Sequence, residues 1–306
     1  MDRGARRRRD DDRRRVAHRV AGPPVTGVPG TAGLPEPRTT DVVRDGVRLR
    51  VLEWGPDDGP AVVVLHGFTG HARQAQYVAP VLADRFRVVA PDQRGHGDSD
   101  RAPVYGTVPM TADLIAVLDA RGIDRAAVVG HSLGGMVALT AVAEHPDRFT
   151  HLVLGDIGPE PAPAGVARIQ ASVAERHVFA DLDDAVTAQA ALSPTADPEA
   201  LRHRVTHNLT PTADGQWTWK YDPALRDRTA RFDNHPPNAL WAFLAAVAVP
   251  ALLLRGEVSD ICTAETAAQM QAANPGLVVV TIPGAGHSIA TDAPGAVATA
   301  VADFLA

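Results

Sequence analysis

The sequence of 306 residues contains a single cysteine, Cys262, and this scarcity excludes two kinds of site. One cysteine cannot form an intramolecular disulfide, and it provides no cysteine cluster for a metal. We interpret Cys262 as a small buried side chain. Long apolar runs are also missing, since no stretch approaches the roughly 18 consecutive apolar residues of a membrane-spanning helix. The composition therefore favours a globular protein.

Aromatic residues are missing from the N-terminal segment, where positive charge is concentrated. Residues 1–20 contain nine arginines and four aspartates, whereas the whole chain has a formal charge of −6. A nucleic-acid-binding segment would interleave aromatic residues, and an export signal would need an apolar stretch, which residues 16–37 do not provide. We predict a disordered tail and a Pro/Gly-rich linker over residues 1–39; translation from a start site assigned too early would also account for it. We expect a cytoplasmic protein that binds neither nucleic acid nor membrane.

Serine is rare as well, with six in the chain, yet one of them lies in an informative pattern. Ser132 is at the centre of Gly130-His131-Ser132-Leu133-Gly134, after the apolar run 126–129 and before a helical pattern that begins at Gly135. Strand, tight turn and helix are typical of a nucleophile elbow, in which the flanking glycines allow the turn. The alternative is a serine that caps a helix in an ordinary turn. We predict that Ser132 is a nucleophile.

Candidate partners for this serine follow two later apolar runs. Asp260 comes shortly after residues 251–254, and His287 shortly after residues 277–282. A serine needs a base within hydrogen-bond reach, and a buried carboxylate orients a histidine in that role. Both candidates follow predicted strands, where open α/β sheets bind ligands. Asp156 also follows a predicted strand and is an alternative acid.

One more loop supplies an expected oxyanion donor. The apolar run 61–65 leads into His66-Gly67-Phe68-Thr69-Gly70. The loop after such a strand normally supplies one backbone N–H of an oxyanion hole, and the residue after the nucleophile supplies the other. We assign these two donors to Phe68 and Leu133.

Five stretches together resemble the α/β-hydrolase fold family, in the branch that carries a cap over the active site. They are His66-Gly67-Phe68, residues 92–99, the Ser132 elbow, residues 256–260 and residues 284–287. The chain order Ser132, Asp260, His287 is the order in this family. The resemblance favours Asp260 over Asp156, because its Gly-x-x-Ser-Asp setting matches the family pattern, with Glu257 a distant third. It implies catalysis with no cofactor and no metal.

Alternating periodicities predict an α/β fold, an eight-stranded mostly parallel sheet flanked by helices. Strand patterns fall at 42–45, 48–54, 61–65, 86–90, 126–131, 152–155, 251–255 and 277–282. The first two flank Asp45-Gly46 and are predicted to form a hairpin. Helical patterns fall at 72–84, 108–121, 135–145, 263–273 and 293–305. The interval between Asp156 and Trp241 has helical patterns at about 164–176, 181–192 and 197–207 but no clear strand. It is too long for a loop in a compact domain. We predict a helical cap over 160–238, inserted in a core formed by 40–159 and 239–306.

Three aromatic residues in the predicted cap, Trp217, Trp219 and Tyr221, either line an apolar substrate pocket or pack the cap onto the core. We expect a serine hydrolase that cleaves a small to medium apolar carboxylic ester or lactone through an acyl-serine intermediate. The same residues would serve a carbon–carbon bond hydrolase or a cofactor-free haloperoxidase or perhydrolase. A small-molecule-binding protein on the same fold is the non-enzymatic alternative. The sequence does not distinguish a monomer from a homodimer.

Overall fold

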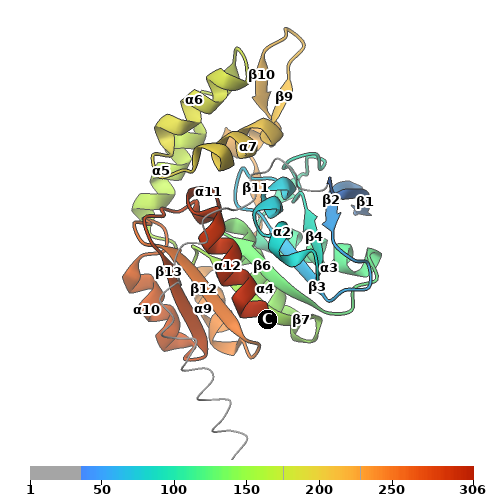
Figure 1. Cartoon of the computed structure of the whole chain (residues 1–306), viewed down its shortest axis with the longest axis vertical. Helices are drawn as coiled ribbons and strands as arrows, with labels where there is room; N and C mark the ends of the chain where they lie inside the picture. Colours follow the sequence, from blue (N-terminus) through green and yellow to red (C-terminus); the bar gives the residue numbers. More distant parts are fainter. Residues whose placement is uncertain (1–35, 175, 228) are drawn as a thin grey trace, which may run out of the picture.

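The computed structural model describes residues 36–174, 176–227 and 229–306, so nearly all of the predicted tail and linker lies outside the described residues. An eight-stranded sheet runs through the molecule in the order β1-β2-β4-β3-β6-β7-β12-β13 (Figure 1). β2 pairs antiparallel with β1 and with β4, and the other neighbours are parallel. In chain order the strands are β1 (Arg38–Arg44), β2 (Val47–Trp54), β3 (Ala61–Leu65), β4 (Arg87–Pro91), β6 (Ala126–His131), β7 (Phe149–Gly155), β12 (Ala251–Gly256) and β13 (Leu277–Ile282). This confirms the predicted fold class.

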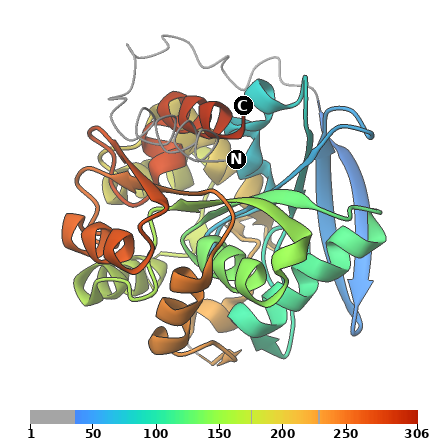
Figure 2. The ribbon, with the colours of Figure 1, turned by 90° about the horizontal axis from the view of Figure 1, so that it is seen from below.

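Both faces of the sheet are buried because apolar side chains point alternately to either side of each strand. Val63 and Leu253 belong to one apolar cluster, whereas their chain neighbours Val62 and Leu252 belong to a second one. The first cluster is covered by α3 (Thr107–Ala120), α4 (Leu133–Glu144), α9 (Pro237–Ala246) and α10 (Ala264–Ala273). The second is covered by η1 (Ala72–Tyr77), α2 (Ala79–Leu82) and α12 (Pro294–Leu305). Figure 2 shows α12 on one side of the sheet and α3 and α4 on the other.

The first two strands form the predicted hairpin. Asp45 and Gly46 make its two-residue turn, with φ angles of 50° and 79°. Positive φ at both positions is the type I′ geometry that matches the twist of paired strands, and it favours an Asp-Gly pair. The predicted helix over 72–84 is instead the short 3₁₀ helix η1 followed by α2. Pro80, near the start of α2, has no N–H with which to continue an earlier helix.

The chain between β7 and α9 forms an insertion above the carboxyl ends of the parallel strands (Figure 1). Its helices α5 (Pro163–Ala174), α6 (Leu182–Leu192) and α7 (Pro198–Asn208) lie close to the predicted positions. The expectation of no strand was wrong, since β8 (Val178–Phe179), β10 (Trp217–Trp219) and β9 (Leu209–Pro211) form a small sheet. Strands of two or three residues are too short to produce a recognisable alternation. An apolar cluster that includes Phe179, Leu201 and Val205 holds α6, α7 and this sheet together.

Shorter elements complete the described chain: β5 (Val104–Tyr105), η2 (Pro146–Arg148), α8 (Pro223–Arg226), β11 (Arg231–Phe232) and α11 (Ile289–Asp292). β11 pairs in parallel with β5, which ties the end of the insertion to the core. Among the residues that the structure describes, the helices are all too short or too polar to cross a bilayer.

Candidate active site

Ser132 lies at the sharp turn between β6 and α4, with φ 51° and ψ −119°. A serine rarely has positive φ, and the surrounding backbone holds it there. Its N–H donates to the carbonyl of Gly155 at 2.9 Å, and its carbonyl accepts from the N–H of Gly135 at 2.8 Å. A Cβ atom at Gly130 would lie 2.2 Å from the carbonyl oxygen of Gly134. The turn therefore needs the glycines of the motif.

His287 faces this serine from the loop after β13. Its Nε2 lies 3.0 Å from the Ser132 Oγ, which is hydrogen-bond distance for a general base. The neighbouring His131 donates from Nε2 to the backbone carbonyl of His287 at 2.8 Å, and the two ring centroids are 4.9 Å apart. Burial lowers the pKa of His131 to about 3, so this ring is neutral and suited to positioning the His287 loop.

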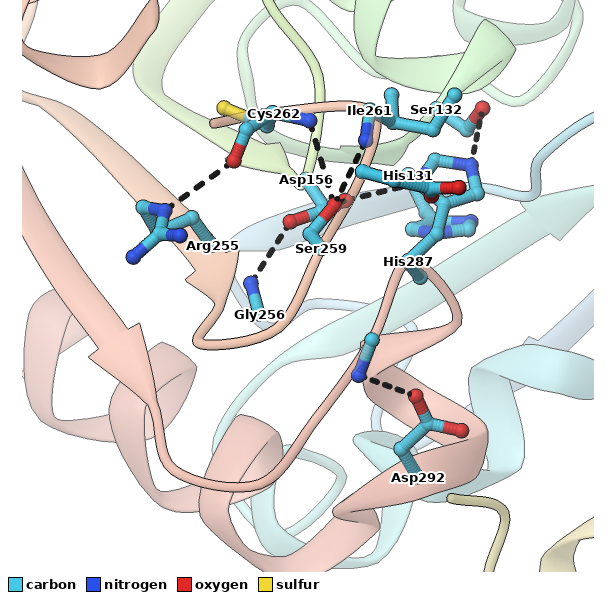
Figure 3. A network of polar contacts seen from close by, with 12 residues as sticks. His131, Ser132, Asp156, Arg255, Gly256, Ser259, Ile261, Cys262, His287 and Asp292 are labelled. Atoms are coloured by element: carbon cyan, nitrogen blue, oxygen red, sulfur yellow. Dashed lines mark hydrogen bonds and ion pairs between the residues drawn. The ribbon is translucent and has the colours of Figure 1, made fainter. Parts of the chain in front are cut away.

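Asp156 is the carboxylate that contacts His287 (Figure 3). It follows β7 directly, is fully buried and has φ 50°. Its Oδ2 accepts from the His287 Nδ1 at 2.8 Å and from the Ser259 hydroxyl at 2.5 Å, and its Oδ1 accepts from the Gly256 N–H at 2.7 Å. These donors satisfy a buried charge and hold the carboxylate in the orientation that fixes the imidazole tautomer.

The preference for Asp260 was therefore wrong. Asp260 accepts two hydrogen bonds from the guanidinium of Arg168 on α5, at 2.6 and 2.7 Å, and its side chain is 39% exposed. Hydrogen bonding to Arg168 lowers the pKa of Asp260. The loop after β12 turns the side chain of Ser259 inward to Asp156, and its neighbour Asp260 then points to the insertion. Glu257 is exposed and accepts from the N–H of Gly284.

Ser259 is the residue that sequence reasoning missed. Its hydroxyl donates to Asp156 and also accepts from the N–H groups of Ile261 and Cys262, at 3.1 and 3.3 Å. Since its acceptor is 103 positions earlier in the chain, no local pattern identified this contact. The motif at 256–260 is thus part of the site through Ser259 and through the backbone of Gly256.

The two expected oxyanion donors are on elements that meet at the elbow. Leu133 is the first residue of α4, and N–H groups in the first turn of a helix have no acceptor within that helix. Phe68 belongs to the loop after β3, which packs so closely that a Cβ atom at Gly67 would be 2.8 Å from the His131 Nδ1. His66 anchors this loop, because its Nε2 accepts from the Gln93 N–H at 3.0 Å. Burial lowers the pKa of His66 to about 3, so it stays neutral in this structural role.

A pocket between the core and the insertion opens onto Ser132 and His287. Trp219 and Tyr221 line it with their rings stacked at a centroid distance of 6.2 Å. Trp217 is not among its lining residues. Trp217 and Trp219 are two positions apart on β10 and share one face of the strand, and both pack against the apolar cluster of the insertion.

The profile of the alpha/beta hydrolase fold family matches residues 60–294, which contain Ser132, Asp156 and His287. The chain belongs to the α/β-hydrolase fold family. A relative named 2-(acetamidomethylene)succinate hydrolase, from Mesorhizobium japonicum, is 30% identical over 270 residues, 88% of this chain and 94% of the relative. Esterase YbfF of Escherichia coli is 30% identical over 80% of this chain and 92% of its own length. The crystal structure of an E-2-(acetamidomethylene)succinate hydrolase superposes with a TM-score of 0.79 at 28% identity, over 88% of this chain and 98% of that one.

This α/β-hydrolase thus has a connected chain of hydrogen bonds from Ser132 through His287 to a buried carboxylate. Such an arrangement can remove a proton from the serine hydroxyl as the oxygen attacks an electrophilic carbon. Membership of this family, together with the relatives named as hydrolases, indicates that the protein is a hydrolase.

Proposed function

We propose that the protein is a serine hydrolase that cleaves a carboxylic ester or lactone through an acyl-serine intermediate. The proposal is supported above all by two consecutive hydrogen bonds. Ser132 Oγ lies 3.0 Å from His287 Nε2, and His287 Nδ1 lies 2.8 Å from Asp156 Oδ2. Relatives named as an esterase and as a hydrolase support the reaction class.

In the first half-reaction, Ser132 Oγ attacks the substrate carbonyl carbon while His287 Nε2 takes the hydroxyl proton. The negative charge moves to the carbonyl oxygen, which the N–H groups of Phe68 and Leu133 stabilise; one such donor typically contributes about 10²–10³ in turnover. Asp156 stabilises the imidazolium. When the carbon–oxygen bond to the alcohol breaks, His287 returns the proton to the leaving alkoxide.

In the second half-reaction, water attacks the acyl-serine and gives its proton to His287. The tetrahedral intermediate collapses to the carboxylic acid, and His287 reprotonates Ser132. The pocket lined by Trp219 and Tyr221 places an apolar part of the substrate beneath the insertion.

The test is hydrolysis of p-nitrophenyl esters from acetyl to dodecanoyl by the wild-type protein and by Ser132→Ala. We expect wild-type turnover with an optimum chain length and no burst or turnover in Ser132→Ala, with unchanged circular dichroism. Equal hydrolysis by both proteins would remove Ser132 from the reaction. A well-folded wild-type protein that cleaves none of these esters would contradict the esterase proposal.

A further inference from the structure

Arg204 stands out among the residues that line the active-site pocket. It lies on α7 and borders the same pocket as Ser132 and His287. Within the described ranges 36–174, 176–227 and 229–306, its guanidinium forms no salt bridge or hydrogen bond, and the contact of Arg204 with His71 is through the backbone carbonyl. The side chain is only partly exposed, so a cation with five N–H donors is held in a cavity without an acceptor from the described protein.

Two other arginines, Arg168 and Arg202, differ from Arg204 because each forms a salt bridge with an aspartate. Arg168, which also lines the pocket, is neutralised by the two contacts with Asp260. Arg202, two positions before Arg204 on α7, is exposed and pairs with Asp183 at 2.7 Å. Among the described residues, by contrast, no carboxylate forms a salt bridge with Arg204, and the aspartates next to Arg168 and Arg202 are already paired.

Asp292 is the carboxylate whose charge acts on Arg204, and one of its two oxygens has another hydrogen-bond partner. Asp292 Oδ2 accepts from the Gly286 N–H at 2.8 Å, next to the loop of His287. Burial lowers the pKa of Arg204, and the nearby Tyr77 and Asp292 offset only part of that shift. An arginine nevertheless stays protonated in proteins, so part of the desolvation cost of its charge is not offset in the free protein.

The backbone around Arg204 is fixed to the core. Its carbonyl accepts from His71 Nε2 at 2.9 Å, and the next turn of α7 is tied down by Asn208, whose amide donates to the carbonyl of Thr69 at 2.8 Å. Both contacts cross from the insertion to the loop after β3. The guanidinium is therefore presented from a rigid element, which is what recognition of a fixed substrate group requires.

We propose that the substrate carries a carboxylate in addition to its scissile ester, and that Arg204 binds this carboxylate. The inference rests on the proposed ester hydrolysis at Ser132. A planar guanidinium pairs with a carboxylate through two parallel N–H···O bonds, which neutralises the cation and fixes the distance between the acid and the scissile carbonyl. The preferred substrate is then an acidic ester with an apolar segment, and a wholly neutral ester is a poor one.

The first experiment compares matched acidic and neutral esters on both sides of the scissile bond. On the acyl side these are the p-nitrophenyl hemiester of adipic acid and p-nitrophenyl hexanoate. On the alcohol side they are 4-acetoxybenzoate and its methyl ester. We expect wild type to favour at least one acidic ester about tenfold in kcat/KM over its neutral match, because a hydrogen-bonded charge pair contributes roughly that factor or more.

Variants of α7 then test whether Arg204 is responsible. Arg204→Gln is expected to lower kcat/KM for the favoured acidic ester about 10–100-fold, and at least tenfold more than for its neutral match. Arg204→Lys should restore part of the preference. Arg202→Gln, on the same helix but outside the pocket, is the matched control and should leave both substrates unchanged. Equal losses on acidic and neutral esters, or no acidic preference in wild type, would overturn the carboxylate site.

A binding measurement separates failure of this inference from failure of the proposed function. Calorimetric titration of adipate into Ser132→Ala, with and without Arg204→Gln, needs no turnover. Suppose that adipate binds to Ser132→Ala, that Arg204→Gln abolishes this binding, and that the wild-type protein hydrolyses no ester. This result would overturn the esterase proposal and retain the carboxylate site. Ser132-dependent hydrolysis without Arg204-dependent acid preference or adipate binding would overturn the carboxylate site alone.

Discussion

The hydroxyl of Ser259 and the imidazole of His287 share one acceptor, Oδ2 of Asp156, at 2.5 and 2.8 Å. Ser259 reaches this oxygen from the loop after β12, whereas His287 reaches it from the loop after β13. Figure 3 shows this arrangement, with Ser259 beneath Asp156 and His287 beside Ser132.

Substitution of Asp156 should distinguish it from Asp260. Asp156→Asn is expected to lower kcat by about 10²–10⁴, because an amide no longer fixes the imidazole tautomer or stabilises the imidazolium. Asp260→Asn removes only the pair with Arg168 and should stay within about threefold of wild type on a neutral p-nitrophenyl ester. Steady-state kinetics with both variants checks this. A severe loss in Asp260→Asn with an active Asp156→Asn would reverse our assignment of the acid.

Loss of the Ser259 hydroxyl should weaken catalysis without abolishing it. Ser259→Ala leaves Asp156 with its contacts to His287 and Gly256, and we expect kcat to fall about tenfold with KM little changed, since a hydrogen bond to a charged group contributes about 1.5–3 kcal/mol. Ser259→Thr keeps a hydroxyl and should recover part of the rate. If the alanine variant has wild-type kcat, Ser259 does not position Asp156.

The two tryptophans of β10 should differ in their effect on substrate binding. Trp219 lines the pocket and stacks on Tyr221, so Trp219→Ala should raise KM for a medium-chain ester about tenfold and change kcat less. Trp217→Ala is the control and should change KM little, because Trp217 packs against the same apolar cluster of the insertion as Trp219 but does not line the pocket. The chain-length series of p-nitrophenyl esters measures both. A larger KM effect from Trp217 would contradict the observed pocket lining.

Stability should fall as the pH is lowered through the range of histidine titration. Burial lowers the pKa of His66 and His131 to about 3, and that of His96, His203 and His207 to about 4. Below the unfolded pKa of about 6.5, the unfolded chain therefore binds more protons than the native protein, and stability decreases between about pH 6.5 and 4. Each such histidine contributes up to about 1.4 kcal/mol per pH unit in that window.

Asp92 acts in the opposite direction. Burial raises its pKa to about 6, so this group alone favours the native state as the pH falls through 6. The histidines outnumber it, and urea unfolding at pH 8, 7, 6 and 5 should show little change between the first two values and a growing loss below them. Stability that is constant or rises from pH 7 to 5 would contradict this account.

Most of the fold could be predicted because its signals are local. The strand at 126–131, the elbow at Ser132 and the Asp-Gly hairpin at residue 45 depend on residues adjacent in sequence, and the structure places each of them as expected. The short strands of the insertion have no such signal, because two or three residues produce no alternation, and the partners of β10 are up to about 40 residues away.

The sequence by itself determined the sheet, the strained serine and the loop that carries His287, since each is defined by a run of apolar residues and the glycines that end it. Only the tertiary structure decided which carboxylate reaches that histidine. Asp156 and Asp260 both follow parallel strands, β7 and β12, that are neighbours in the sheet. The conformation of the loop after β12 turns Ser259 toward Asp156 and leaves Asp260 to Arg168, and that choice depends on contacts between residues about 100 positions apart.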